Sequence, residues 1–132
     1  MKYRNLGKSG LKISELSFGS WVTFNKQVDK NLAERMFGTC LDAGINFFDN
    51  AEGYERGESE VVMGKALKAL INPRDSYCVS SKVFFSAKEN PLPTQMGLSR
   101  KHITEACHQA LERLQVDYLD LYFCHRADPE TP

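Results

Sequence analysis

The sequence lacks the features typical of a membrane protein, a secreted protein or a nucleic-acid-binding protein. It has no run of about 18 apolar residues, which is the length that a membrane-spanning helix needs. It has no charged-then-apolar leader of the kind that directs secretion. Its 17 basic and 17 acidic side chains balance, so no electrostatic attraction to nucleic acid is expected. We therefore expect a cytoplasmic protein with no nucleic-acid partner and no direct membrane insertion.

No two of the four cysteines have the spacing of a metal or disulfide motif. Cys40, Cys78, Cys107 and Cys124 form no C-x-x-C pair. This argues against a zinc cluster or a disulfide framework and favours reduced thiols in the core. No metal site is expected.

A phosphate-binding loop is also missing, although Gly7-Lys8-Ser9 resembles the end of one. The loop needs an earlier glycine where Lys2 stands, and a strand before it. The two glycines between short extended segments instead predict a β-hairpin over residues 1 to about 15.

What the chain does contain is an alternation of strand-like and helix-like segments. The predicted strands are Leu16–Trp21, Ile45–Phe48, Tyr77–Lys82 and Tyr118–Cys124, and the predicted helices run from Asp29 to Gly44, from Ser59 to Leu70, and from the cap Ser99 to Leu114. This order predicts an α/β fold with four parallel strands and three helices. In such folds, and in barrels above all, reactive groups collect at the carboxyl ends of the strands.

Three successive strand ends carry proton-handling side chains. Asp49 and Tyr54 follow the second strand, Lys82 ends the third, and His125 follows the fourth. We expect the four side chains to meet at one mouth. A single polar residue at the end of an apolar strand usually marks only a strand that reaches water, so the prediction of a site depends on the whole set.

The set suits the reduction of a carbonyl group. Hydride transfer to a carbonyl carbon leaves a developing alkoxide, which needs a proton donor. A free tyrosine, with a pKa of about 10, is too weak an acid, whereas an adjacent ammonium lowers that pKa and a carboxylate keeps the ammonium charged. Tyr54, Lys82 and Asp49 fit these roles, and a neutral His125 fits the role of a donor that orients the substrate oxygen.

Other segments and residues are weaker indicators of function. The long connection from Val83 to Leu98 is of a length that is often functional, and we expect His102 and His108 on the next helix to be solvated surface residues. The aromatic residues near the strand ends would suit planar or apolar carbonyl substrates, or else serve packing alone; they are Trp21, Phe24, Tyr54, Phe84 and Phe85.

Six segments together resemble the aldo-keto reductase superfamily. They are L-G-K-S-G-L, G-I-N-F-F-D-N-A-E-G-Y, S-S-K-V-F-F, G-L-S-R-K-H-I, L-E-R-L-Q-V-D-Y-L-D and H-R-A-D-P-E-T-P. W-V-T-F, K-V-F-F, G-L-S-R-K-H-I and D-P-E-T-P are most similar to the branch that includes the potassium-channel β subunits and their bacterial relatives. The resemblance covers essentially the whole chain, which we treat as one domain, residues 1–132.

The resemblance implies a TIM-type (α/β)8 barrel with a hairpin across its bottom, which binds NADPH without a Rossmann domain. The absence of any G-x-G-x-x-G motif agrees with this. Position by position, the catalytic tetrad matches Asp49, Tyr54, Lys82 and His125, with Tyr54 as general acid. The residues that match around the nicotinamide and its ribose are Ser20, Trp21, Gln27 and Asp49. Asparagine stands at the position of His125 in the channel branch, so histidine favours a working reductase.

Four strands and three helices are only the N-terminal half of such a barrel, which runs to about 250 residues. The chain is either the first part of a longer enzyme or a half-length product that pairs with a second copy, as a homo-oligomer, or stays inactive. The functional hypotheses are an NADPH-dependent reductase of small aldehydes or ketones, a cofactor-binding regulatory subunit of the channel-β type, and an inactive half-barrel fragment.

Overall fold

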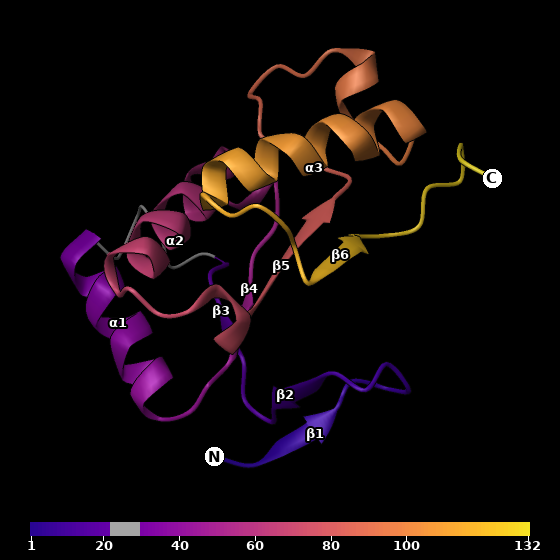
Figure 1. Cartoon of the computed structure of the whole chain (residues 1–132). Helices are drawn as coiled ribbons and strands as arrows, with labels where there is room; N and C mark the ends of the chain where they lie inside the picture. Colours follow the sequence, from indigo (N-terminus) through magenta and orange to yellow (C-terminus); the bar gives the residue numbers. More distant parts are fainter. Residues whose placement is uncertain (22–29) are drawn as a thin grey trace.

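A computed structural model of the chain describes residues 1–21 and 30–132 (Figure 1). Its centre is a four-stranded parallel sheet in the order β3-β4-β5-β6. The strands are β3 (Phe18–Gly19), β4 (Phe47–Asp49), β5 (Cys78–Val83) and β6 (Leu121–Cys124). Neighbours in the sheet are also neighbours along the chain, and the helices lie between them in sequence. These are the strands and helices of the N-terminal half of an (α/β)8 barrel, as predicted.

Three helices cover one face of the sheet (Figure 1). They are α1 (Lys30–Asp42), α2 (Glu58–Ala69) and α3 (Arg100–Leu114). Short 3-10 helices occupy Tyr54–Gly57, Arg74–Ser76 and Pro93–Gln95. Phe37 of α1 and Met63 of α2 pack with Phe48 and Val79 of the sheet, and all four are fully buried. This core fixes the strands, so the side chains at their carboxyl ends are held by a rigid base.

The N-terminal hairpin lies at the opposite end of the sheet from the carboxyl ends of the strands. It pairs β1 (Tyr3–Asn5) with β2 (Lys12–Ser14) in antiparallel register. The backbone N–H of Ser14 donates to Asn46 Oδ1 at 2.7 Å, and the backbone N–H of Asn46 donates to Ser14 Oγ at 3.1 Å. Because Asn46 directly precedes β4, these bonds tie the hairpin to the amino end of that strand. The predicted hairpin is confirmed.

The last predicted strand is shorter than expected. The Asp120 N–H still donates to the Val79 carbonyl at 3.0 Å, but the Val79 N–H donates to the Asp120 carboxylate at 2.8 Å, and Tyr118 is bound by a side chain. The Arg74 guanidinium lies over the Tyr118 ring, 3.9 Å from its centre, and donates to the Tyr118 carbonyl at 2.8 Å. The strand therefore begins at Leu121. Cys124 at its end is exposed, so the prediction that all four thiols lie in the core was wrong for this residue.

The prediction that His102 is a solvated surface residue was also wrong. Its side chain is buried, with 4% relative exposure, whereas His108 is exposed as expected. His102 lies in the first turn of α3, one turn before Ala106 and two before Ala110, so it continues the buried side of the helix. Its Nδ1 lies 2.8 Å from the Gly97 carbonyl, because the connection from β5 to α3 folds against this turn.

None of the helices in the described part of the chain is long and apolar enough to span a membrane.

Candidate active site

Asp49 and Lys82 are brought together by the register of β4 and β5. Asp49 ends β4 and pairs with Ser80 of β5, so its carboxylate faces the side chain two positions further along that strand. Lys82 Nζ donates to Asp49 Oδ2 at 2.6 Å and to the Asn50 carbonyl at 2.8 Å. Ser80 Oγ donates to Asp49 Oδ1 at 2.6 Å. Both carboxylate oxygens are thus engaged, and the ammonium is fixed at the carboxyl ends of the strands.

Tyr54 joins this pair from the loop that follows β4. Its hydroxyl lies 3.1 Å from Lys82 Nζ, which also lies 4.8 Å from the centre of the Tyr54 ring. The loop is held from below by backbone bonds: the N–H of Glu52 donates to the Lys82 carbonyl at 3.1 Å, and the N–H of Tyr54 donates to the Ala51 carbonyl at 3.1 Å. The structure therefore assembles Asp49, Lys82 and Tyr54 into one hydrogen-bonded chain.

The residues after Tyr54 have an unusual backbone. Glu55, Arg56 and Gly57 have φ angles of 46°, 55° and 85°. This left-handed region favours glycine and costs a non-glycine residue free energy, so its use by Glu55 and Arg56 indicates that surrounding contacts hold the turn in place. The turn leads directly into α2 and fixes the direction in which Tyr54 leaves the loop.

His125 and a group of aromatic side chains surround the Tyr54 hydroxyl. The rings of Tyr54 and His125 lie 5.8 Å apart between centres, and His125 lies 5.4 Å from Phe85. A cavity of about 360 Å³ opens here and is lined by Trp21, Gly53, Tyr54, Phe85, His125 and Arg126. Its walls present aromatic faces, a phenol, an imidazole and a guanidinium.

The surroundings of His125 favour its neutral form. Burial lowers the pKa of His125, and the positive charges of Lys82 and Arg126 lower it further, against an opposing effect of Asp49. A neutral imidazole carries one N–H, which can donate to an oxygen in the cavity while the other ring nitrogen accepts.

Of the other residues predicted for the site, Ser20 and Trp21 lie beside the cluster in different ways. Ser20 is fully buried, and both its N–H and its Oγ donate to the Asp49 carbonyl, at 3.2 and 3.1 Å. Trp21 is 70% exposed, and its ring lies 6.4 Å from that of Tyr54. Gln27 and Phe24 lie outside the described residues. Phe84 does not line the cavity. It packs instead against a small apolar cluster formed by Val83, Leu98 and Ala106.

Sequence reasoning missed three contributors to this site. Ser80 holds the second carboxylate oxygen of Asp49, and the Asn50 carbonyl holds the Lys82 ammonium. Arg126 lies at the cavity wall with its guanidinium 4.8 Å from the centre of the Phe85 ring. The position of Ser80, two residues before Lys82 on the same side of the strand, was a usable signal for the first of these.

The chain matches one protein family over most of its length. The model of the Aldo/keto reductase family matches residues 15–132. The chain belongs to this family. Two curated relatives are each named probable voltage-gated potassium channel subunit beta: one from Arabidopsis thaliana, 49% identical over 132 residues, and one from Oryza sativa subsp. japonica, 48% identical over 132 residues. Each match covers 100% of this chain but 39% of the relative, so the chain spans about two fifths of their length.

Membership of the aldo/keto reductase family supports oxidoreduction as the general chemistry, and family members generally use NADP(H). The described residues fit only the reactive end of such a cofactor. A hollow of about 360 Å³ beside Trp21 and Tyr54 has room for a nicotinamide ring, and the exposed indole offers it a flat surface. The cavity is too small for a whole dinucleotide.

Proposed function

We propose that this chain carries the catalytic residues of an NADP(H)-dependent oxidoreductase that reduces aldehydes or ketones, with Tyr54 as the proton donor. The observation that carries the proposal is the hydrogen-bonded chain in which Asp49 holds Lys82 at 2.6 Å and Lys82 holds the Tyr54 hydroxyl at 3.1 Å. This series of hydrogen bonds ends at Tyr54, which lines the cavity, so a substrate oxygen in the cavity can reach the phenol.

Each residue has a distinct part in the proposed reaction. The bound cofactor supplies the hydride. The Tyr54 hydroxyl donates a proton to the substrate oxygen, and Lys82 places a positive charge beside the developing tyrosinate. Asp49 keeps the ammonium charged and aimed at Tyr54. A neutral His125 donates a hydrogen bond to the same substrate oxygen and orients it.

The cofactor-side assignment rests on the family resemblance, which matches Ser20, Trp21, Gln27 and Asp49 to the residues around the nicotinamide and its ribose. Two observations support it: Trp21 borders the cavity, and Ser20 is hydrogen-bonded to the Asp49 carbonyl. Trp21, Tyr54 and Phe85 supply aromatic surface that suits small planar or apolar carbonyl compounds. We further propose that residues 1–132 belong to a single domain and act in the cytoplasm, as part of a longer chain or as a homo-oligomer.

A regulatory role is the second candidate. The two relatives reported above are named as channel subunits, and a subunit of that kind would bind the cofactor in order to control a partner. His125 favours turnover over this alternative, because a neutral imidazole beside Tyr54 serves the reaction and has no evident part in cofactor binding alone.

A cofactor titration followed by a turnover assay separates these candidates. NADPH binding to the full chain is followed by fluorescence, with NADH as the control, and aldehyde-dependent NADPH oxidation is then measured. Selective binding with turnover supports the reductase. Selective binding without turnover favours the regulatory role, and no binding to either cofactor contradicts both.

A further inference from the structure

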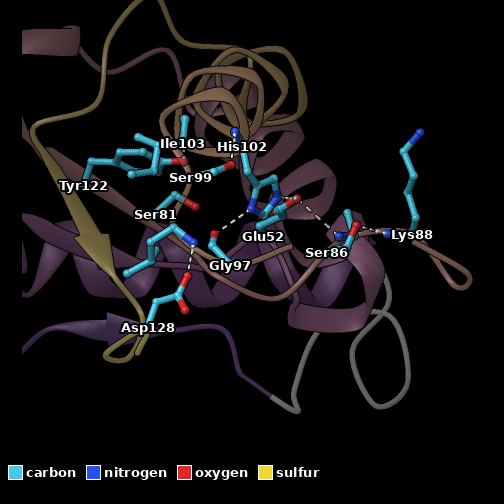
Figure 2. A network of polar contacts seen from close by, with 12 residues as sticks. Glu52, Ser81, Ser86, Lys88, Gly97, Ser99, His102, Ile103, Tyr122 and Asp128 are labelled. Carbon is cyan, nitrogen blue, oxygen red and sulfur yellow. Dashed lines mark hydrogen bonds and ion pairs between the residues drawn. The ribbon is translucent and has the colours of Figure 1, made fainter. Parts of the chain in front are cut away.

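A second pair of titratable side chains lies behind the loop that carries Tyr54. Glu52 and His102 are buried, with relative exposures of 2% and 4%. His102 Nε2 lies 3.4 Å from Glu52 Oε1 and 3.4 Å from Glu52 Oε2. Figure 2 shows the two side chains facing each other, with Gly97 on one side and Ser86 on the other. None of the roles proposed above uses this pair.

The hydrogen-bond partners of His102 fix how many protons the pair holds. Nδ1 lies 2.8 Å from the Gly97 carbonyl, and a carbonyl only accepts, so we assign a proton to Nδ1. Nε2 then faces the two oxygens of Glu52. Without a further proton, a ring lone pair would face a carboxylate inside the protein, which is strongly unfavourable. One proton must therefore lie between Nε2 and Glu52.

The pair connects three segments of the chain. Glu52 stands two positions before Tyr54, and its Oε1 accepts from the Ala87 N–H at 3.4 Å. His102 belongs to the first turn of α3, where its N–H donates to Ser99 Oγ at 3.2 Å. The Tyr54 loop, the connection from β5 to α3, and α3 itself thus meet at this pair. When the shared proton is present, attraction across the pair pulls the three segments together.

Other charges lie around the pair and enter its proton balance. The charged groups near the pair are Lys88 from the connection and Lys101, Glu105 and Arg113 from α3. Tyr122 from β6 also faces it, and the charges of Glu52 and of Glu60 in α2 both act on the Tyr122 hydroxyl. A cavity of about 160 Å³ separates the pair from the lysines. Burial raises the pKa of Glu52, while the charges of His102 and Arg113 oppose that rise.

We propose that Glu52 and His102 are positioning residues, which share one proton and thereby hold the Tyr54 loop in the geometry that places the Tyr54 hydroxyl on Lys82. Loss of the proton releases the loop. The catalytic meaning of this bridge rests on the proposed role of Tyr54, but the bridge itself is tested without turnover. The bridge can therefore fail its test while the proposed role of Tyr54 stands, and the reverse outcome can be recognised as well.

The test follows the Tyr54 ring by NMR in the full chain, with the tyrosine Cζ carbon labelled and the pH raised from about 5 to 9. Wild type is expected to show a step in the Tyr54 signal as the pair loses its proton. Glu52→Gln is expected to abolish that step, because the new amide donates to the unprotonated Nε2 and the contact then needs no shared proton. Any step from His125 persists in the variant and serves as an internal reference.

Glu105→Gln is the matched control, since Glu105 lies on the same cavity but is exposed and pairs only with exposed Lys101 among the described residues. It is expected to keep the wild-type step. His102→Gln offers a second variant, because its amide can donate to Glu52 and should also abolish the step. A wild-type Tyr54 signal without the step, or a step unchanged in both pair variants, would overturn the proposal.

Discussion

Two polar clusters lie back to back on β5 and differ in what they can do. Lys82 bonds Asp49 and Tyr54 on one side of the strand. The neighbouring residue, Ser81, donates to Glu60 Oε1 at 2.6 Å on the other side, and Arg113 Nε donates to Glu60 Oε2 at 2.6 Å. Both clusters contain a carboxylate, a cation and a hydroxyl, so composition alone does not separate them.

The difference lies in access. The two cations are similarly exposed, Lys82 at 16% and Arg113 at 18%. Asp49, however, is 27% exposed and Tyr54 lines the cavity, whereas Glu60 is 0% exposed and is enclosed between α2, α3 and β5. A ligand can therefore reach the Lys82 cluster but not the Glu60 cluster. The same chemical groups would serve the proposed reaction in one place, and in the other they hold two helices on the sheet.

The largest expected effect is a loss of kcat in Tyr54→Phe, which tests the accessible cluster around Lys82. Loss of a general acid typically costs about 10²–10⁴-fold in rate, so kcat should fall by that factor while NADPH binding and the urea midpoint stay close to wild type. Tyr118→Phe, at a partly exposed ring that packs on Arg74, is the control and should be neutral. A Tyr54→Phe variant with near-normal kcat would remove Tyr54 from the role of proton donor.

The reverse outcome is expected at the buried cluster. Glu60→Gln leaves the Arg113 charge without its partner, and breaking a buried pair costs about 3–5 kcal/mol. We expect the free energy of unfolding in urea to fall by about 3 kcal/mol, since Arg113 is 18% exposed and recovers some hydration. Glu105→Gln, at an exposed ion pair, should cost no more than about 0.5 kcal/mol. Equal losses in the two variants would show that burial does not set the cost of removing a paired carboxylate.

The smallest expected effect is on the titration of His125. Arg126→Gln removes one of the charges that lower the pKa of His125, so NMR should show that pKa shifted upward. Wild-type His125 binds protons less readily when folded, so its contribution to stability is lost as the pH falls from about 6.5. The variant should lose less stability over this interval. Arg100→Gln should leave the His125 titration unchanged; a matching shift there would point to a general charge effect.

The order of strands and helices was predictable because it depends on local patterns. Met63 and Leu67 of α2, and Ala106 and Ala110 of α3, recur at helical spacing, and all four are buried. The meeting of Asp49 and Lys82 followed from a general property of parallel sheets, whose carboxyl ends share one edge. Their contact could therefore be expected before any distance was known.

What the sequence did not reveal depends on packing between distant segments. Periodicity shows which side of a helix is apolar, but it does not show that a loop covers a polar residue at the helix start, as at His102. Nor does it show that Arg74 takes Tyr118 out of the strand by bonding its carbonyl. Ser80 carried a positional signal, because it lies on the same side of β5 as Lys82, but the sequence does not show that its hydroxyl donates to Asp49.

Because Ser81 and Lys82 point to opposite sides of β5, the protein should tolerate few insertions or deletions in this strand. Because side chains alternate along a strand, one residue inserted or deleted within β5 would turn Lys82 toward the helices and Ser81 toward the cavity. Both clusters would be lost at once, although every side chain would still be present. A scan of single-residue insertions and deletions should therefore find β5 intolerant and the exposed segment around residues 88–91 permissive.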